Sequence, residues 1–315
     1  MITRHRLLLN LSVLLLFLQV SPVSVADRNL ENLQIEGKYI GLGLHRLYVD
    51  CRGSQEPTVL VDVGLGDASI NWLPVMNGIK EEARICLYDR AGYGWSDNGP
   101  GARTTAQITY ELHAMLEMGR IPGPYIVVGH SFGGFTARYF ATVYPAETVG
   151  AVLVDSSHPE QVIRLADLDK QEAKRELIVS RLSLPPKDLT PLQRKWYFLN
   201  SSRKATFTLM DELKHFTESA RQVENAGEFP DIPLAVMTRG KPLLPTINGK
   251  SLEAEWVHMQ NDLVTLSPQA WHVVVENSGH NIYADNPRAI IQEIKKVIKL
   301  ARMNIQEEYV TGAID

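Results

Sequence analysis

Short apolar runs, each ending in a turn of small or polar residues, alternate with helical patterns along most of this chain. Tyr125-Ile-Val-Val128 and Val149-Gly-Ala-Val-Leu-Val154 are two such runs, and neither has the strict polar alternation of a half-exposed strand. Continuous apolar strands are typical of parallel sheets whose two faces are both covered by helices. The repeated order of strand and helix therefore predicts an α/β fold with a mostly parallel central sheet.

The pattern begins with a strand pair and is interrupted once. Leu33 to Ile40 and Leu44 to Cys51, separated by glycines, are expected to form an antiparallel hairpin. Residues from about 159 to 230 are charged and helical in character. We therefore expect a helical cap, residues 159–230, inserted after the sixth strand into a core formed by residues 27–158 and 231–315. The other expected strands are Thr58 to Val63, Ala83 to Tyr88, Val149 to Val154, Ile232 to Met237 and Trp271 to Val275, and the expected helices are Thr104 to Met118, Phe132 to Tyr144, Lys170 to Ser180, Leu192 to Asn200, Leu209 to Val223, Leu252 to Leu266 and Pro287 to Leu300.

The first 26 residues have the three-part composition of a secretory signal peptide. Arg4 and Arg6 precede an apolar run from Leu7 to Val20, and Ser24 and Ala26 occupy the −3 and −1 positions of a cut after Ala26. The apolar run is shorter than the roughly 20 residues of a membrane span. We expect a secreted or periplasmic protein with no stable membrane span after cleavage. The alternative is a membrane anchor formed by an uncleaved N-terminal segment.

Composition argues against several classes of partner. A total of 32 Lys and Arg against 36 Asp and Glu gives a net charge of −4, so there is no electrostatic reason to expect a nucleic acid. The histidines and acids do not fall into metal-ligand spacing, and we expect no metal and no cofactor. Gly92 and Gly94 lack the further glycines of a nucleotide-binding loop. The two cysteines, Cys51 and Cys86, would favour a bridge in an oxidising compartment.

One turn carries the pattern of a catalytic nucleophile. Gly129-His130-Ser131-Phe132-Gly133-Gly134 follows the apolar run that ends at Val128, and it opens a helical pattern. In this context a G-x-S-x-G turn strains the serine and projects its hydroxyl, with glycines that let the backbone fold tightly. The sequence therefore predicts Ser131 as a nucleophile.

A serine nucleophile needs a base, and histidine titrates near neutrality. Of the nine histidines, His280 lies in a turn after the last expected strand, where the chain order serine, acid, histidine places the base. His158, in a loop after a strand, is the alternative. His130 is interpreted as a residue of the turn itself, with its side chain pointing away from Ser131.

These two turns, taken with Asp89-Arg-Ala-Gly-Tyr-Gly-Trp-Ser96, resemble the motifs of the α/β-hydrolase superfamily. The resemblance covers residues from about 30 to 303 and is weakest in the expected cap. It implies an α/β-hydrolase fold and a triad of serine, histidine and acid. The Asp89 to Ser96 stretch is interpreted as a structural turn, and Asp62 has no role that the sequence assigns.

The resemblance also locates the triad acid. In many members the acid follows the strand after the cap, but Thr238 to Pro245 contains no acid here. In a minority, including some haloalkane dehalogenases, the acid lies one strand earlier, which corresponds to Asp155. Because the ends of neighbouring parallel strands face one crevice, Asp155 could reach His280. Glu253 and Asp262, on a later expected helix, are the alternatives.

The resemblance further implies an oxyanion hole and a cysteine pairing. The backbone N–H of Phe132 is one expected donor, and that of Leu65 in the loop Gly64-Leu-Gly-Asp67 is the other. The superfamily commonly has His-Gly in this loop, where Val63-Gly64 stands here. In the superfamily's sheet order the strands of Cys51 and Cys86 are neighbours, so a disulfide between them can form.

The expected function is that of an exported serine hydrolase that cleaves a small ester or amide through an acyl-enzyme on Ser131. A carboxylic-ester hydrolase is favoured over an aminopeptidase on superfamily frequency, and serine at 131 argues against dehalogenase or epoxide hydrolase chemistry. The alternatives are a non-catalytic ligand-binding protein on the same fold, or an acyltransferase or lyase with the same triad. The cap contains the aromatic residues Trp196, Tyr197, Phe198 and Phe207, whose apolar character suggests a small-molecule substrate with an apolar group. At helical spacing, packing is the more frequent role of such aromatics, and it is the alternative. The oligomeric state is left open.

Overall fold

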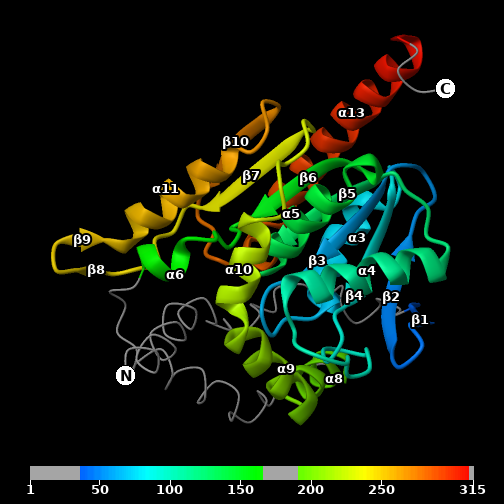
Figure 1. Ribbon diagram of the computed structural model, residues 1–315, viewed down its shortest axis with the longest axis horizontal. Helices are drawn as coiled ribbons and strands as arrows, with labels where there is room; N and C mark the ends of the chain where they lie inside the picture. Colours follow the sequence, from blue (N-terminus) through cyan, green and yellow to red (C-terminus); the bar gives the residue numbers. More distant parts are fainter. Residues whose placement is uncertain (1–35, 166–190, 312–315) are drawn as a thin grey trace.

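A computed structural model describes residues 36–165 and 191–311 (Figure 1). Eight strands form one sheet in the order β1-β2-β4-β3-β5-β6-β7-β10. β1 and β2 are antiparallel to each other and β2 is antiparallel to β4, whereas all the other neighbours are parallel. The strands are β1 (Lys38–Gly41), β2 (Arg46–Arg52), β3 (Thr58–Asp62), β4 (Arg84–Asp89), β5 (Tyr125–His130), β6 (Thr148–Val154), β7 (Leu234–Arg239) and β10 (Ala270–Val275). The predicted α/β architecture and hairpin are confirmed.

Helices cover both faces of the sheet, which explains the continuous apolar strands. In β3, Val59 and Val61 contact the core cluster under α3 (Leu73–Ile79) and α13 (Pro287–Thr311). Leu60 points to the opposite cluster, under α4 (Thr105–Gly119) and α5 (Gly133–Val143). Successive side chains of a strand point to opposite faces, so a strand that is buried on both faces needs apolar residues at every position.

The described residues between β6 and β7 contain α6 (Gln161–Arg164), α8 (Pro191–Asn200), α9 (Arg203–Lys214) and α10 (Phe216–Glu224). We call α8, α9 and α10 the cap helices. The prediction of one helix from Leu209 to Val223 is wrong, because the helix is interrupted at His215, which separates α9 from α10. The break lets Phe216 pack on Phe132 and Phe135, with ring centroids 5.8 and 5.2 Å apart. The helix expected at Lys170 to Ser180 lies outside the described residues, and the cap boundaries 159–230 stay a prediction.

Several short elements have no counterpart in the prediction. α3 is a seven-residue helix whose sequence, Leu-Pro-Val-Met-Asn-Gly-Ile, contains a proline and a glycine and shows no amphipathic period. The others are η3 (Ser69–Trp72), η4 (Pro145–Glu147), α12 (Ile282–Asp285) and the hairpin of β8 (Thr246–Ile247) with β9 (Lys250–Ser251). The predicted helix at 252–266 is α11 (Leu252–Val264), and the last helix continues past its predicted end to Thr311.

A disulfide joins Cys51 and Cys86, which face each other in the register of β2 and β4. The predicted pairing is therefore present in the structure. The expected signal peptide, residues 1–26, lies outside the described residues. Within the described ranges, the structure contains no helix that is both long enough and apolar enough to cross a bilayer.

Candidate active site

Ser131 occupies the sharp turn between β5 and α5. Its φ of 53° lies in the left-handed region, which a residue with a side chain adopts only under strain. Positions 129 and 133, two residues on either side of Ser131, require glycine because a side chain there would clash with neighbouring backbone atoms. A Cβ on Gly129 would lie 2.6 Å from the Cα of Gly134, and one on Gly133 would clash with the carbonyl oxygen of Asp62. The tight fold of the turn on itself at Gly129 and its close packing against the end of β3 at Gly133 therefore explain the G-x-S-x-G pattern.

His280 and Asp155 meet at the carboxyl end of the sheet. The distance between His280 Nδ1 and Asp155 Oδ2 is 2.6 Å, although 125 residues separate the two in sequence. The carboxylate is fully buried and the imidazole nearly so. Because a carboxylate only accepts hydrogen bonds, Nδ1 carries the proton, and the lone pair is on Nε2. This is the tautomer in which a histidine can take a proton from a serine hydroxyl.

The Asp155 carboxylate has three further donors that the sequence analysis did not foresee. Arg239, the last residue of β7, donates from Nη1 to Oδ2 at 2.8 Å and from its backbone N–H to Oδ1 at 3.3 Å. The Trp256 indole donates to Oδ1 at 2.8 Å. Burial alone would raise the pKa of Asp155, but the charge of Arg239 and the hydrogen bond to His280 outweigh it and hold this pKa well below its usual range. Asp155 therefore stays ionised.

The two alternative acids bond elsewhere. Glu253 accepts from Arg239 Nη2 at 2.9 Å and from the backbone N–H groups of Leu243 and Leu244 at 3.0 and 2.9 Å. Asp262 lies 2.8 Å from Arg164 in a partly exposed ion pair. In the structure Asp155 thus contacts His280, as predicted. Glu253 instead pairs with Arg239, the same arginine that bonds Asp155.

His130 packs against His280. Their ring centroids are 4.7 Å apart, and His130 Nε2 lies 2.9 Å from the carbonyl oxygen of His280, to which it donates. Burial, with a smaller effect from His280, lowers the pKa of His130 to about 3, so the ring is neutral. The interpretation of His130 as a residue of the turn alone is therefore incomplete, since its ring also supports the His280 turn.

The alternative base, His158, lies in a different cluster. Its Nδ1 accepts the backbone N–H of Glu160 at 3.2 Å, and burial lowers its pKa to about 4. Side-chain atoms of His158, Glu160 and Asp262 come within 4.8 Å of one another, a proximity that the sequence spacing did not indicate. Arg164 bonds both carboxylates, at 2.6 and 2.8 Å, so the group forms an ion-pair network.

The loop after β3 lies beside Ser131. A Cβ on Gly64 would be 3.3 Å from the Cβ of Ser131, so the peptide that joins Gly64 to Leu65 is next to the serine. Phe132 directly precedes α5, at a helix end where backbone N–H groups have no partner within the helix. The positions of the two expected oxyanion donors, Leu65 and Phe132, are compatible with that role.

Among the residues important to this site, Arg239 gave the clearest signal that the sequence analysis missed. It is a lone charge at the end of the strand Leu234–Arg239, at the position after which many superfamily members carry the triad acid. β7 lies between β6 and β10 in the sheet. Asp155 follows β6 and His280 follows β10. A cation at the end of the strand between them is therefore an expected partner of Asp155.

A strained serine turn between a parallel strand and its helix, beside a paired histidine and aspartate, is characteristic of hydrolases built on an α/β sheet. Residues 59–293 match the model of the Alpha/beta hydrolase family, and the chain belongs to this family.

Relatives of the chain have both known and unassigned activities. It is 26% identical over 239 residues to the uncharacterized protein YqjL of Bacillus subtilis (strain 168), covering 76% of this chain and 82% of that protein. It is 27% identical over 260 residues to Esterase Rv0045c of Mycobacterium tuberculosis, covering 78% and 84%. The crystal structure of a lipase candidate (lip1) from Acinetobacter baumannii AYE has a TM-score of 0.66 and 22% identity, covering 88% and 94%, which shows a shared fold.

Proposed function

We propose that this protein is an exported serine hydrolase that cleaves a small ester or amide through an acyl-enzyme on Ser131. The observation that carries the proposal is the 2.6 Å bond between His280 Nδ1 and the buried, ionised Asp155. Ser131, held at φ 53°, is joined to this pair through its neighbours, since its N–H donates to the carbonyl oxygen of Val154 and His130 bonds the carbonyl oxygen of His280. Strain of this kind persists where the surroundings impose it, and it clusters at functional sites.

The proposed reaction has two halves. His280 Nε2 takes the proton of Ser131 while the serine oxygen attacks the substrate carbonyl, and the backbone N–H groups of Phe132 and Leu65 bind the oxyanion. His280 then gives its proton to the leaving alcohol or amine as the bond to the carbonyl carbon breaks. In the second half His280 takes a proton from water, the hydroxide attacks the acyl-enzyme, and the acid is released with Ser131 reprotonated.

An ester with an apolar group is the proposed substrate class. Two of the cap helices, α9 and α10, pack on the core through an apolar cluster that contains both Leu65 and Phe132, together with Phe135, Leu209 and Phe216. The side chains of the two residues whose N–H groups are the proposed oxyanion donors therefore belong to an apolar cluster. The esterase among the curated relatives favours an ester over an amide.

Export is the second part of the proposal. The disulfide between Cys51 and Cys86 is of a kind that persists in oxidising compartments, and residues 1–26 have signal-peptide composition. N-terminal sequencing of the protein recovered from the periplasm or medium should begin at Asp27. Recovery of the intact N-terminus in the membrane fraction would favour the anchored alternative.

A fluorophosphonate probe tests the nucleophile. We expect the wild type to be labelled, Ser131→Ala to be unlabelled, and Ser278→Ala, which alters a buried serine near His280, to be labelled like the wild type. A panel of acyl esters and aminopeptidase substrates then defines the bond that is cleaved. Equal labelling of Ser131→Ala and wild type would refute the proposal, and ester binding without labelling or turnover would favour a ligand-binding protein.

A further inference from the structure

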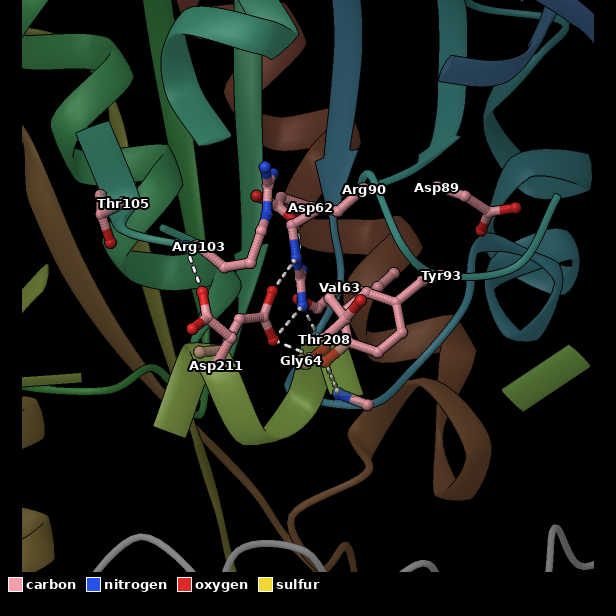
Figure 2. Close-up of polar contacts among 12 residues, drawn as sticks. Asp62, Val63, Gly64, Asp89, Arg90, Tyr93, Arg103, Thr105, Thr208 and Asp211 are labelled. Atoms are coloured by element: carbon pink, nitrogen blue, oxygen red, sulfur yellow. Dashed lines mark hydrogen bonds and ion pairs between the residues drawn. The ribbon is translucent and has the colours of Figure 1, made fainter. Parts of the chain in front are cut away.

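Arg90 is buried below the loop that contains Leu65. It follows β4, its side chain is 1% exposed, and it forms ion pairs with two carboxylates, Asp62 at 2.6 Å and Glu212 at 2.9 Å. Figure 2 shows the guanidinium surrounded by Asp62, Val63, Gly64 and Tyr93. Burial alone would lower the pKa of Arg90, but the two carboxylates raise it well above its usual value, so the charge is retained. Asp62, to which the sequence assigned no role, is thus one of the partners of Arg90.

The guanidinium also bonds the backbone of the loop. Nη1 donates to the carbonyl oxygen of Val63 at 2.5 Å, and Nη2 donates to that of Gly64 at 2.9 Å. The carbonyl of Gly64 and the N–H of Leu65 belong to one planar trans peptide and point in opposite directions. Because the carbonyl is held toward Arg90, the Leu65 N–H is held away from Arg90. A charge-assisted bond to that carbonyl also polarises the peptide and strengthens its N–H as a donor.

The peptide on the other side of Leu65 is bonded as well. Gly66 N–H donates to the Tyr93 hydroxyl at 3.3 Å, and this hydroxyl donates to Glu212 Oε2 at 2.7 Å. Arg90 Nε donates to Glu212 Oε1 at 2.9 Å. The groups that bond the loop on both sides of Leu65 therefore share one carboxylate, that of Glu212.

Glu212 comes from the cap. It lies in α9, is fully buried, and is 122 residues from Arg90 in sequence. We propose that Glu212 is a positioning residue for the oxyanion hole: through Arg90 and Tyr93, the docked cap helix α9 fixes the direction of the Leu65 N–H. The proposal rests on the proposed function, since it concerns the donor that would bind the oxyanion of the Ser131 adduct.

Asp211 provides a matched control on the same helix. Its carboxylate accepts the backbone N–H of Arg103 at 2.7 Å, and this bond ties α9 to the segment before α4 (Figure 2). Asp211→Asn therefore weakens the docking of the cap through a contact that does not involve Arg90 or Tyr93. A role of Glu212 in docking alone would make the two variants behave alike.

The experiment compares Glu212→Gln and Asp211→Asn with the wild type. The readouts are kcat and KM for the best ester of the panel, thermal stability, and the inhibition constant of a trifluoromethyl ketone, whose adduct with a serine carries an oxyanion. Loss of a whole oxyanion donor costs about 10²- to 10³-fold in kcat. Because Glu212→Gln misorients the donor without removing it, we expect kcat to fall about 10-fold, inhibitor affinity to fall by a similar factor, and KM to change less than about twofold. Asp211→Asn should keep both kcat and inhibitor affinity within about twofold.

Unchanged kcat and inhibitor affinity in Glu212→Gln would overturn the inference, and so would an equal loss in Asp211→Asn. If Glu212→Gln does not fold, Tyr93→Phe removes the hydroxyl shared by Gly66 and Glu212 while keeping the ring, and we expect kcat to fall several-fold with KM unchanged. Wild-type kcat in Tyr93→Phe would then refute the inference. A wild type that neither labels nor turns over esters refutes the proposed function and this inference with it, whereas an active wild type beside an unaffected Glu212→Gln refutes the inference alone.

Discussion

Replacing Arg239 with methionine removes the guanidinium that bonds both Asp155 and Glu253 while keeping an unbranched apolar stem. Asp155 is fully buried, and in Arg239→Met it would keep its bonds to His280 and Trp256 and the backbone N–H of residue 239. It would lose its counter-charge at 2.8 Å. The hydrogen-bond geometry is thus mostly preserved, and the perturbation is mainly electrostatic.

The expected loss in the free energy of unfolding follows from burial. Breaking a buried ion pair by removing one partner costs about 3–5 kcal/mol, because the remaining charge is left uncompensated. The Glu253 side chain is 17% exposed and keeps two backbone donors, so Glu253→Gln should cost only about 1–2 kcal/mol. Arg239→Met alone leaves the charge of Glu253 without its partner, whereas the double variant has a neutral glutamine at position 253. The loss of stability in the double variant should therefore be smaller than the sum of the two single losses by about 1 kcal/mol.

Kinetics separates the roles of the two acids. Loss of the acid in a Ser–His–Asp triad lowers kcat by roughly 10⁴-fold, and we expect a fall of this order in Asp155→Asn. Arg239→Met should lower kcat about 10-fold, because Asp155 is less firmly placed but still present. Glu253→Gln should stay near the wild type. Unfolding in guanidinium chloride and ester hydrolysis by the same preparations measure both quantities.

Asp262→Asn is the control for this series. Asp262 and Arg164 are 45% and 30% exposed, so breaking their ion pair should cost at most about 1 kcal/mol and leave kcat unchanged. The reasoning would be wrong if Arg239→Met lost less than about 1 kcal/mol of stability. Near-full activity in Asp155→Asn with a large loss in Glu253→Gln would transfer the triad role to Glu253.

Three further predictions concern stability. The unfolded chain binds a proton at His130 near pH 6.5 and the folded chain only near pH 3, so the free energy of unfolding should fall as the pH drops through this window, by ~3 kcal/mol at pH 4.5. His130→Gln, which can still donate to the His280 carbonyl, should flatten this part of the pH–stability curve. Replacing Cys51 and Cys86 with alanine opens a loop of 35 residues and should cost ~4 kcal/mol, measured by denaturation with and without reductant. Ser131→Gly should be more stable than Ser131→Ala by ~1 kcal/mol, because glycine adopts a φ of 53° without strain.

Each of these has a contrary outcome. Parallel pH–stability curves for wild type and His130→Gln would show that His130 titrates normally in the folded protein. Two titratable thiols in the unreduced, unfolded protein would contradict the disulfide. A Ser131→Ala variant as stable as Ser131→Gly would mean that the turn carries little backbone strain.

Local geometry made the Ser131 turn predictable from the sequence. The strained geometry of Ser131 depends on its own dihedral angles and on glycines within three residues, so it is visible in a window of six positions. The inner strands β3, β5 and β6 were equally visible because burial on both faces favours long apolar runs. α3 was not, since a helix of seven residues that includes a proline and a glycine is too short to show a clear period.

Pairings across long stretches of chain were decided by the tertiary structure. The sequence, through its resemblance to a family, could rank Asp155 above Glu253. Only the order β6-β7-β10 determines which carboxylate reaches His280, and that Arg239 at the end of the middle strand bonds this carboxylate. The contact of Glu212 with Arg90 depends in the same way on how α9 docks on the core. Backbone dihedral angles and side-chain periods act over a few residues, whereas contacts between residues more than a hundred positions apart form only when the sheet order and the cap bring them together.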